Sequence, residues 1–313
     1  MDLRQLSNFV RIVDAGSLTR AASQIGVAQP ALTYQIANLE EELGTSLLIR
    51  SASGVRPTEA GLVLYREARS TMRQVGQISE MVRIANDEPA GQVTIGFPSV
   101  LASFFSAPLV GAVRAKFPRI KLQLYEGESA QQRSLLVNNR VELALICEYK
   151  AAEQFDRLLL FSQRLALLCD GRTRQDRAGD PISMTEAAAR VVALPSVGNP
   201  VRAAVDAGLS KLGLSIEPLV EANSLRTLVG AVEQGLGPAI TLWMPPNVGP
   251  VGSRLVFRPI IDPDLQLDIS MNRSKATHLS PAALNVQQIL TQVVFDRIRQ
   301  PDWPGAMLHE KAP

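Results

Sequence analysis

The sequence is poor in the side chains that active sites and metal sites commonly use. Its 313 residues include 2 cysteines and 2 histidines, and 5% of the residues are aromatic. Two cysteines exclude a disulfide framework, and two histidines leave little material for histidine-based catalysis or a metal centre. Nucleophile-elbow and phosphate-loop motifs are missing as well. We therefore expect a protein that is not an enzyme and that uses no metal ion and no cofactor.

Charge of one sign and long apolar runs are also lacking. The 32 Lys and Arg residues nearly balance the 30 Asp and Glu residues, so any basic patch must come from arrangement rather than excess. No apolar run approaches the roughly 18 residues of a membrane span, and the N-terminus lacks the pattern of a signal peptide. Hydrophobic residues make up 46% of the chain, which suffices for a folded core. We expect a cytoplasmic protein of two or three domains without membrane contact.

Each cysteine ends an apolar run. Cys147 closes the run 141–147 and Cys169 closes the run 165–169. Such positions are typical of buried, free cysteines in strands. The alternative is a redox-sensing pair, which predicts that Cys147→Ser and Cys169→Ser abolish the response of the protein.

The first 60 residues have the apolar spacing of short helices. We predict these helices over 3–15, 18–25 and 29–43. A helix-turn-helix needs a small residue at the helix crossing, a permissive turn and a large apolar residue beneath the crossing. Ala22, Gly26 and Leu32 meet these three needs. Spacing alone leaves an ordinary three-helix bundle as an equal alternative.

A predicted β-hairpin after the third helix separates these alternatives. Residues 47–50 and 55–57 have the pattern of its strands, and residues 51–54 that of its turn. Arg50 and Arg56 lie near the strand ends, where they could reach phosphate or the minor groove. A hairpin in this position favours a winged helix-turn-helix.

A long helix without proline is predicted from Glu59 to Asn86. Its apolar residues follow alternating spacings of four and three, as in a coiled-coil seam. These residues are Leu64, Ala68, Thr71, Val75, Ile78, Val82 and Ala85. A narrow stripe on so long a helix favours pairing with a second copy of the chain. Residues 86–91 end the helix and mark a linker.

Beyond the linker, strands and helices alternate, which indicates α/β units with largely parallel sheets. Strands are expected over 92–97, 121–126, 141–147, 164–169, 191–194, 217–220, 238–242, 255–260 and 265–271, and helices over 102–116, 130–138, 182–189, 200–212, 224–234 and 280–298.

These features together carry a family resemblance. Residues 3–61 resemble the N-terminal domain of LysR-type transcriptional regulators, through stretches 9–23, 27–44 and 47–61 that match without a gap. The likeness continues at 91–97, 141–146 and 233–239, and so covers nearly the whole chain. Within the family, details at 13–19 and 47–50 are similar to the branch of the nitrogen-assimilation control proteins.

The resemblance implies an α+β multidomain fold. Its parts are a winged helix-turn-helix with a long linker helix and a two-lobed α/β effector domain like the periplasmic binding proteins. The implied bounds are a DNA-binding domain at 1–58, a dimerising linker helix at 59–90, an effector domain at 91–300 and a C-terminal tail at 301–313. Within the effector domain, the first lobe takes about 92–162 and 266–300, and the second about 163–265.

The resemblance also implies a transcriptional regulator that binds promoter DNA and answers to a small molecule between its lobes. Dimers form through the linker helix and assemble into homotetramers, and RNA polymerase is a further candidate partner. One alternative is a metabolite-binding protein with weakened DNA binding, because residues 29–43 contain no Lys or Arg. An enzyme built on the α/β half is a rival without support in the sequence. The effector, the target promoters and the direction of regulation stay open.

Candidate DNA contacts lie at the start of the second helix, on the third helix and on the hairpin. Gln can pair with adenine, Ala can pack on a thymine methyl, and Tyr34 stands where relatives often have a basic residue. Without basic residues on the helix, its N-terminus and the hairpin arginines carry more of the phosphate contact. The candidates are Leu18, Gln29, Pro30, Ala31, Thr33, Tyr34, Gln35, Asn38, Arg50 and Arg56.

Candidate effector contacts lie where strands of the α/β half lead into helices, since α/β sheets bind ligands at the carboxyl ends of their strands. Hydroxyl groups and free backbone N–H groups there favour a small anion. Helix capping is the simpler role for the serines. The candidates are Ser99, Val100, Ser129, Ser196, Arg202 and Ser224.

Overall fold

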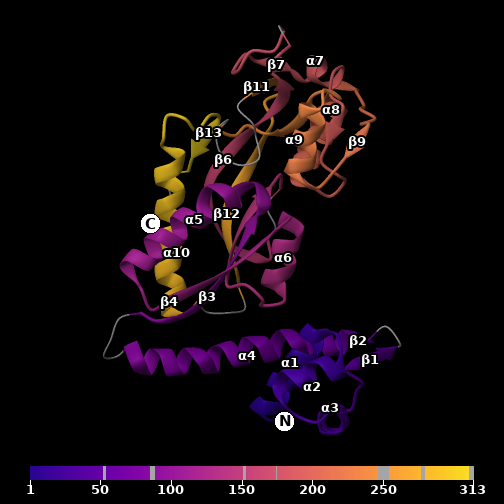
Figure 1. The fold of residues 1–313 in the computed structure, drawn as a ribbon, viewed down its shortest axis with the longest axis vertical. Coiled ribbons are helices and arrows are strands. Elements are labelled where there is room, and N and C mark those ends of the chain that lie inside the picture. Colours follow the sequence, from indigo (N-terminus) through magenta and orange to yellow (C-terminus); the bar gives the residue numbers. More distant parts are fainter. Residues whose placement is uncertain are drawn as a thin grey trace. The chain divides into compact units, whose positions relative to one another are not determined.

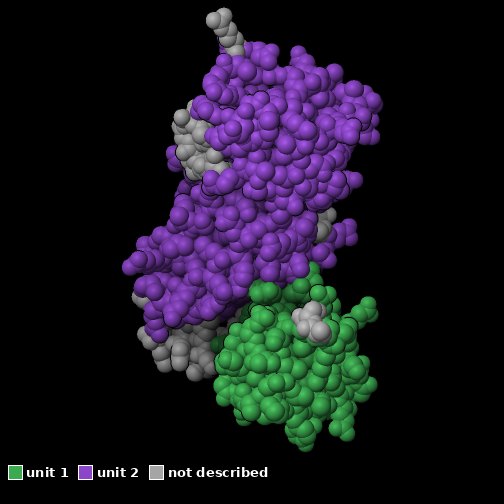
Figure 2. Space-filling view, turned by 45° about the vertical axis from the view of Figure 1, so that its right-hand side comes forward, with its two compact units in different colours: residues 1–88, 137–140 green, residues 89–136, 141–313 purple. Residues whose placement is uncertain are grey.

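The computed structural model describes residues 1–51, 54–84, 89–150, 153–173, 175–245, 254–275 and 279–309. The chain divides into two compact units (Figure 2). Unit 1 comprises Met1–Glu88 with Val137–Arg140, and unit 2 comprises Pro89–Leu136 with Val141–Pro313. None of the described helices combines the length and apolar character needed to cross a bilayer. Within the same residues, no three metal-ligating side chains gather.

Unit 1 contains the three predicted short helices, α1 (Leu3–Ala15), α2 (Leu18–Ile25) and α3 (Gln29–Leu43). Each ends at a glycine in the left-handed conformation, and these glycines are Gly16, Gly26 and Gly44. The core between the helices is apolar and fully buried. It includes Phe9, Ile12, Ala22, Leu32, Ile36 and Leu39.

The predicted hairpin is present as β1 (Leu48–Ser51) and β2 (Gly54–Pro57), which pair antiparallel. Ala52 and Ser53 of the predicted turn lie outside the described residues. Glu40 of α3 holds the hairpin, because its Oε1 accepts hydrogen bonds from the N–H groups of Leu47 (2.7 Å) and Leu48 (3.1 Å). A Cβ on Gly61 would lie 2.0 Å from the carbonyl oxygen of Leu47, so this position requires glycine.

The long helix α4 (Glu59–Ile84) spans 26 residues, or about 39 Å at 1.5 Å per residue. It is fastened to α1, since the Tyr65 hydroxyl donates to Asp14 (2.6 Å) and Arg69 pairs with the same carboxylate (3.0 Å). Burial, followed by the hydrogen bond to Asp14, raises the pKa of Tyr65 to about 12.

The predicted seam of α4 changes character along the helix. Ala68 is buried, whereas Val75 and Ile78 are 36% and 58% exposed in the single chain. Ala85 of the seam and residues 86–88 of the predicted linker lie outside the described residues, and the side chain of Val82 is not described. Pairing of α4 with a second copy stays a prediction that this uncovered apolar stripe supports.

Unit 2 is built on one extended sheet (Figure 1). At one end, β3 (Gly91–Pro98) pairs parallel with β4 (Ile120–Gly127) and β5 (Leu143–Glu148). β12 (Gln266–Ser274) then runs antiparallel to β5. The helices that follow or cover these strands are α5 (Ser99–Lys116), α6 (Ser129–Val137) and α10 (Pro281–Ile298). We call this assembly the first lobe.

The second lobe lies between β6 and β12 in the chain and contains shorter strands. β10 (Ala239–Leu242), β8 (Ala193–Leu194) and β9 (Val220–Glu221) pair in parallel order. The other strands of the lobe are β7 (Ile182–Ser183) and β11 (Leu255–Asp262), and its helices are α7 (Met184–Ala188), α8 (Pro200–Leu212) and α9 (Leu225–Glu233). The predicted helix over 182–189 is corrected, because Ser183 caps α7 and the residues before Met184 pair with β11.

One strand belongs to both lobes. β6 (Phe155–Asp170) pairs with β12 along its first ten residues and with β10 and β11 along its last six. The prediction of a strand over 164–169 was too short. Asp156, Arg157 and Arg164 break the apolar pattern, because they form ion pairs at the sheet surface.

Residues 301–309 are not a free tail, which corrects the sequence-based expectation for 301–313. β13 (Ala306–Leu308) pairs antiparallel with β6. Trp303 is 6% exposed and packs against Phe104, Phe105 and Phe161. Its ring N–H donates to Oε1 of Gln163 (2.8 Å), in the middle of β6. Burial of the indole ring therefore fastens the end of the chain to the strand that joins the lobes.

Candidate functional site

The N-terminus of α3 differs from those of its neighbours in unit 1. Asp2 and Ser17 cap α1 and α2 with side-chain hydrogen bonds, whereas Ala28 gives α3 no such cap. The first N–H groups of a helix need partners, and an anion can supply them. Gln29, Pro30 and Ala31 surround this helix start and are exposed. Pro30 has no N–H, and the N–H of Ala31 donates to the Ala28 carbonyl (3.1 Å), so the start of α3 offers a phosphate the N–H of Gln29.

The remaining candidates near the helix-turn-helix divide into exposed and structural residues. Tyr34 is 68% exposed, and Asn38 is half-buried. The Thr33 hydroxyl is buried without a partner among the described residues. Gln35 accepts a hydrogen bond from the buried Asn8 (2.6 Å) and so braces α1. Leu18 is 8% exposed and part of the core, which corrects its assignment to the DNA-contacting surface.

The hairpin arginines are exposed, and neither forms an ion pair with a described residue. Arg50 lies opposite Val55, and Arg56 lies opposite Ile49. Because neighbouring positions of a strand point to opposite faces, the two guanidinium groups leave the hairpin on opposite sides. Such a pair can contact two different phosphate positions.

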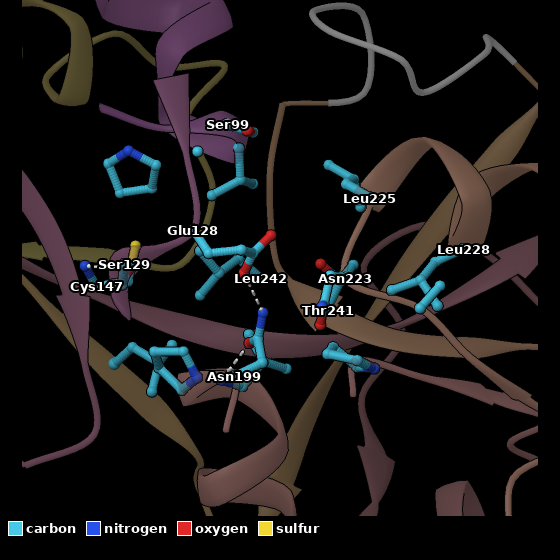
Figure 3. A pocket seen from close by; sticks show the side chains of 18 residues that line it. Ser99, Glu128, Ser129, Cys147, Asn199, Asn223, Leu225, Leu228, Thr241 and Leu242 are labelled. Atoms are coloured by element: carbon cyan, nitrogen blue, oxygen red, sulfur yellow. Dashed lines mark hydrogen bonds between the residues drawn. The ribbon is translucent and has the colours of Figure 1, made fainter. Parts of the chain in front are cut away.

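In unit 2, four helices begin at one cavity between the lobes (Figure 3). Its volume is about 70 Å³. α5 and α6 reach it from the first lobe, and α8 and α9 from the second. The polar residues that line it are Ser99, Glu128, Ser129, Asn199, Asn223 and Thr241.

The predicted effector contacts divide into three groups. Ser99, Val100 and Ser129 line the cavity, although the Ser129 hydroxyl already accepts a hydrogen bond from the N–H of Cys147 (3.1 Å). Ser224 lines a wider groove of about 460 Å³ beside it. Ser196 is not among the lining residues that the structure describes.

Arg202 does not line the cavity either. Its guanidinium group pairs with Asp206 (2.9 Å) and Glu221 (2.6 Å) on the surface of the second lobe. Two carboxylates compensate its charge, so it is not free for a ligand. The anion site that we expected at the start of α8 therefore lacks its basic side chain.

The sequence analysis missed the charged residue of the cavity. Glu128 is half-buried, and its Oε2 accepts a hydrogen bond from the side-chain N–H of Asn199 (3.0 Å), which comes from the other lobe. Burial raises the pKa of Glu128, and the hydrogen bond from Asn199 lowers it by less. The available signal was position, since Glu128 directly follows a strand and precedes a helix, as Ser99 does.

Both cysteines are buried and free. Burial raises the pKa of Cys147 and of Cys169 to about 12. Their thiols are therefore protonated at neutral pH and poor nucleophiles. This chemistry disfavours the redox-sensing alternative.

A winged helix-turn-helix followed by a two-lobed α/β domain defines a class of DNA-binding regulators. The family model of the bacterial regulatory helix-turn-helix protein, lysR family, matches residues 3–62, and that of the LysR substrate binding domain matches residues 86–294. The chain therefore belongs to the LysR family, as the sequence predicts. Its function is that of a LysR-type transcriptional regulator with a DNA-binding and an effector-binding domain.

Relatives and solved structures agree with this assignment. The chain is 36% identical over 306 residues to the nitrogen assimilation regulatory protein nac of Escherichia coli (strain K12), covering 96% of this chain and 97% of that protein. The corresponding protein of Klebsiella aerogenes is 33% identical over 295 residues, covering 94% and 95%. These two matches confirm the predicted likeness to the nitrogen-assimilation branch.

The fold matches full-length regulators of known structure. A full-length OxyR variant from Pseudomonas aeruginosa has a TM-score of 0.74 at 19% identity, covering 100% of this chain and 99% of that one. Full-length CbnR complexed with its target DNA has a TM-score of 0.64 at 17% identity, covering 94% and 100%.

Proposed function

We propose that this regulator reads promoter DNA with the start of α3 and with Arg50 and Arg56 of the hairpin. The observation that carries the proposal is the uncapped, exposed N-terminus of α3, in the same unit as two exposed arginines that form no ion pair with a described residue. Free backbone N–H groups and guanidinium groups both bind phosphate oxygens. Gln29 and Ala31, in the same turn, supply contacts to base edges.

The proposal extends to assembly and to control. The apolar stripe of α4, exposed at Val75 and Ile78, supports pairing of two chains through this helix. The proposal includes tetramers of two such dimers, RNA polymerase as a partner and a cytoplasmic location, and family membership supports these parts. The cavity between the lobes supports control by a small molecule, which shifts the regulator between states by binding one of them more tightly.

A footprint on the DNA upstream of the protein's own gene tests the DNA-reading proposal. The wild type should protect two separated patches, and the Arg50→Ala, Arg56→Ala double variant should lose this protection. An Arg4→Ala, Arg11→Ala double variant, which removes the same charge from the exposed face of α1, is the matched control and should protect like the wild type. Equal protection by both double variants contradicts the role of the hairpin.

A salt titration of the same complex gives a second measure. Because α3 contains no Lys or Arg, few phosphate contacts come from its side chains, and the slope of log K against log salt should be shallow. The double variant of Arg50 and Arg56 should lower the magnitude of this slope by about two, at about one per phosphate contact. A slope as steep as that of regulators with strongly basic recognition helices contradicts the proposal.

A further inference from the structure

The charges around the inter-lobe cavity restrict the class of ligand that it can hold. This question builds on the proposed control by a small molecule and concerns the same cavity. Among the described residues that line it, Glu128 is the one with a charged side chain, and none is Lys, Arg or His. The adjoining groove adds one charge of each sign, from Glu126 and Arg226. In the cavity itself, an anion alone would face the Glu128 carboxylate without a basic side chain in the lining.

The backbone around the cavity contributes partial positive charge, which is opposite in sign to the charge of Glu128. The first turns of α5 and α9 lack a side-chain cap, and both helices begin at the cavity. Their free N–H groups, together with the positive ends of the helix dipoles, favour a negative group. A cation alone would therefore find Glu128 but would also face these helix starts.

A polar side chain of the second lobe marks the cavity as a ligand site independently of the helix starts. Thr241 is 5% exposed and lines the cavity, and its hydroxyl forms no hydrogen bond with a described residue. A hydroxyl that faces a cavity without a partner from the chain can bond to a ligand there. The Oε1 atom of Glu128 likewise accepts no hydrogen bond from a described residue, whereas Oε2 accepts one from Asn199.

We propose that the cavity binds a small zwitterion of the α-amino-acid class. Its ammonium group pairs with Oε1 of Glu128, and its carboxylate accepts hydrogen bonds from the first turns of α5 and α9 and from the Thr241 hydroxyl. This arrangement satisfies both signs of charge and the unpartnered hydroxyl at once. It replaces the expectation of a simple anion.

The size of the cavity agrees with such a ligand. A volume of about 70 Å³ is several times the roughly 10–15 Å³ that a cavity needs to hold one water molecule. This is enough for the ammonium group, the α-carbon and the carboxylate of an amino acid. The side chain of the ligand would extend into the wider groove, which shares Ser99, Glu128, Asn223 and Leu225 with the cavity.

Calorimetric titration of the full-length protein at pH 7 tests the inference. The probes are the proteinogenic amino acids and, for each one that binds, its analogue without the amino group, such as propionate for alanine. At least one amino acid should bind with a Kd below about 1 mM, equivalent to about 4 kcal/mol. Its deaminated analogue should bind at least tenfold more weakly.

Substitution of the charged residue should reverse this preference. Glu128→Gln keeps an oxygen that can accept from Asn199 but removes the negative charge. This variant should lose at least tenfold in affinity for the amino acid and gain affinity for the deaminated analogue. Glu217→Gln is the matched control, because Glu217 is exposed and lines neither the cavity nor the groove, and this variant should bind like the wild type. Thr241→Val should weaken binding, which places the probe in the cavity.

Three results would overturn the inference. They are a wild type that prefers the deaminated analogue, a panel in which no amino acid binds, and a Glu128→Gln variant that behaves like Glu217→Gln. Circular dichroism and melting curves of each variant show that it is folded. The footprint separates this failure from failure of the proposed function. Protection of DNA without amino-acid binding rejects the ligand class alone, whereas amino-acid binding without DNA protection rejects the DNA-reading proposal alone.

Discussion

Helices without a side-chain cap begin at two sites of this molecule, the start of α3 and the inter-lobe cavity, and the surroundings of the two sites differ. The start of α3 is exposed and belongs to the same unit as Arg50 and Arg56, which form no ion pair with a described residue. The starts of α5 and α9 face a small cavity whose one charged side chain is the carboxylate of Glu128, among the residues described there. In the two proposals above, the same backbone groups bind a polyanion in one unit and a zwitterion in the other. The side chains beside a helix start, rather than the start itself, select the ligand.

The largest expected effect comes from giving the start of α3 a carboxylate of its own. In Ala28→Asp, the new side chain can cap α3 from a residue that already has extended backbone, so stability should rise by about 1 kcal/mol. The same carboxylate repels DNA phosphates. Affinity for the promoter should fall roughly a hundredfold, or about 2.8 kcal/mol, in an equilibrium binding assay.

Ala28→Asn is the control for this substitution. It caps the helix without adding charge and should therefore lose less affinity than Ala28→Asp. Equal losses in the two variants would show that α3 needs free N–H groups but that charge beside them has no influence.

The comparison extends to stability through two carboxylates of unit 2. Asp176 has basic partners, whereas Glu128 has none among the described residues. Burial opposes ionisation of Asp176, but hydrogen bonds from Arg190 (2.6 Å), Thr173 (2.8 Å) and Arg258 (3.1 Å) outweigh it and hold its pKa at about 2. Asp176→Asn should lower the free energy of unfolding at pH 7 by about 2 kcal/mol, since it leaves two partly buried guanidinium groups uncompensated. Glu128→Gln, without a basic partner to lose, should leave stability nearly unchanged.

The pH dependence of the Asp176 effect has a defined sign. A carboxyl group with a depressed pKa stabilises the fold above its unfolded pKa near 4, and this contribution is lost as the pH falls through about 2. The stability difference between the wild type and Asp176→Asn, measured by urea unfolding, should therefore shrink between pH 4 and pH 2. A difference that stays constant over this range contradicts the ionic role.

The smallest expected effect concerns the residue that joins the lobes across the cavity. Asn199 caps α8, with its Oδ1 accepting from the N–H of Val201 (2.9 Å), and also donates to Glu128. Asn199→Ala should cost about 1 kcal/mol of stability. It should also raise the pKa of Glu128 further, because the hydrogen bond that lowers this pKa is removed while burial remains. Carbon NMR titration of the carboxyl group measures the shift.

Asn223→Ala is the matched control, since Asn223 lines the cavity without a described hydrogen bond. It should leave the pKa of Glu128 near that of the wild type. A pKa of Glu128 that falls in Asn199→Ala would contradict the assignment of this hydrogen bond.

Local signals explain how much of the fold the sequence could predict. Gly16, Gly26 and Gly44 each end a helix that the spacing of apolar residues predicts, so unit 1 follows from short-range patterns. β6 does not, because its charged residues are matched by partners far away in the chain, as Arg157 is by Asp268. The full length of β6 follows only from its pairing with neighbouring strands of the sheet.

The candidate sites show the same limit. Exposed residues at the start of α3 follow from the helical pattern, and Ser99 and Ser129 follow from their places after strands. Thr241 gave no signal, since a hydroxyl within a short apolar strand is indistinguishable from a core position until the second lobe is assembled. The position of Arg202 in the sequence was misleading, because its guanidinium group pairs with the carboxylates of Asp206 and Glu221, which come from other turns of the chain.

The anchoring of the chain's end on β6 has a spectroscopic consequence. The protein contains two tryptophans, and Gln163 touches both, accepting from the Trp303 ring and donating to the Trp243 carbonyl (2.6 Å). Gly305 lies so close to the Trp243 ring that a Cβ there would approach within 2.5 Å. All indole fluorescence of the molecule therefore originates at the junction of the lobes. The unlabelled protein carries its own optical probe, whose emission should respond when a ligand draws the lobes into a new arrangement.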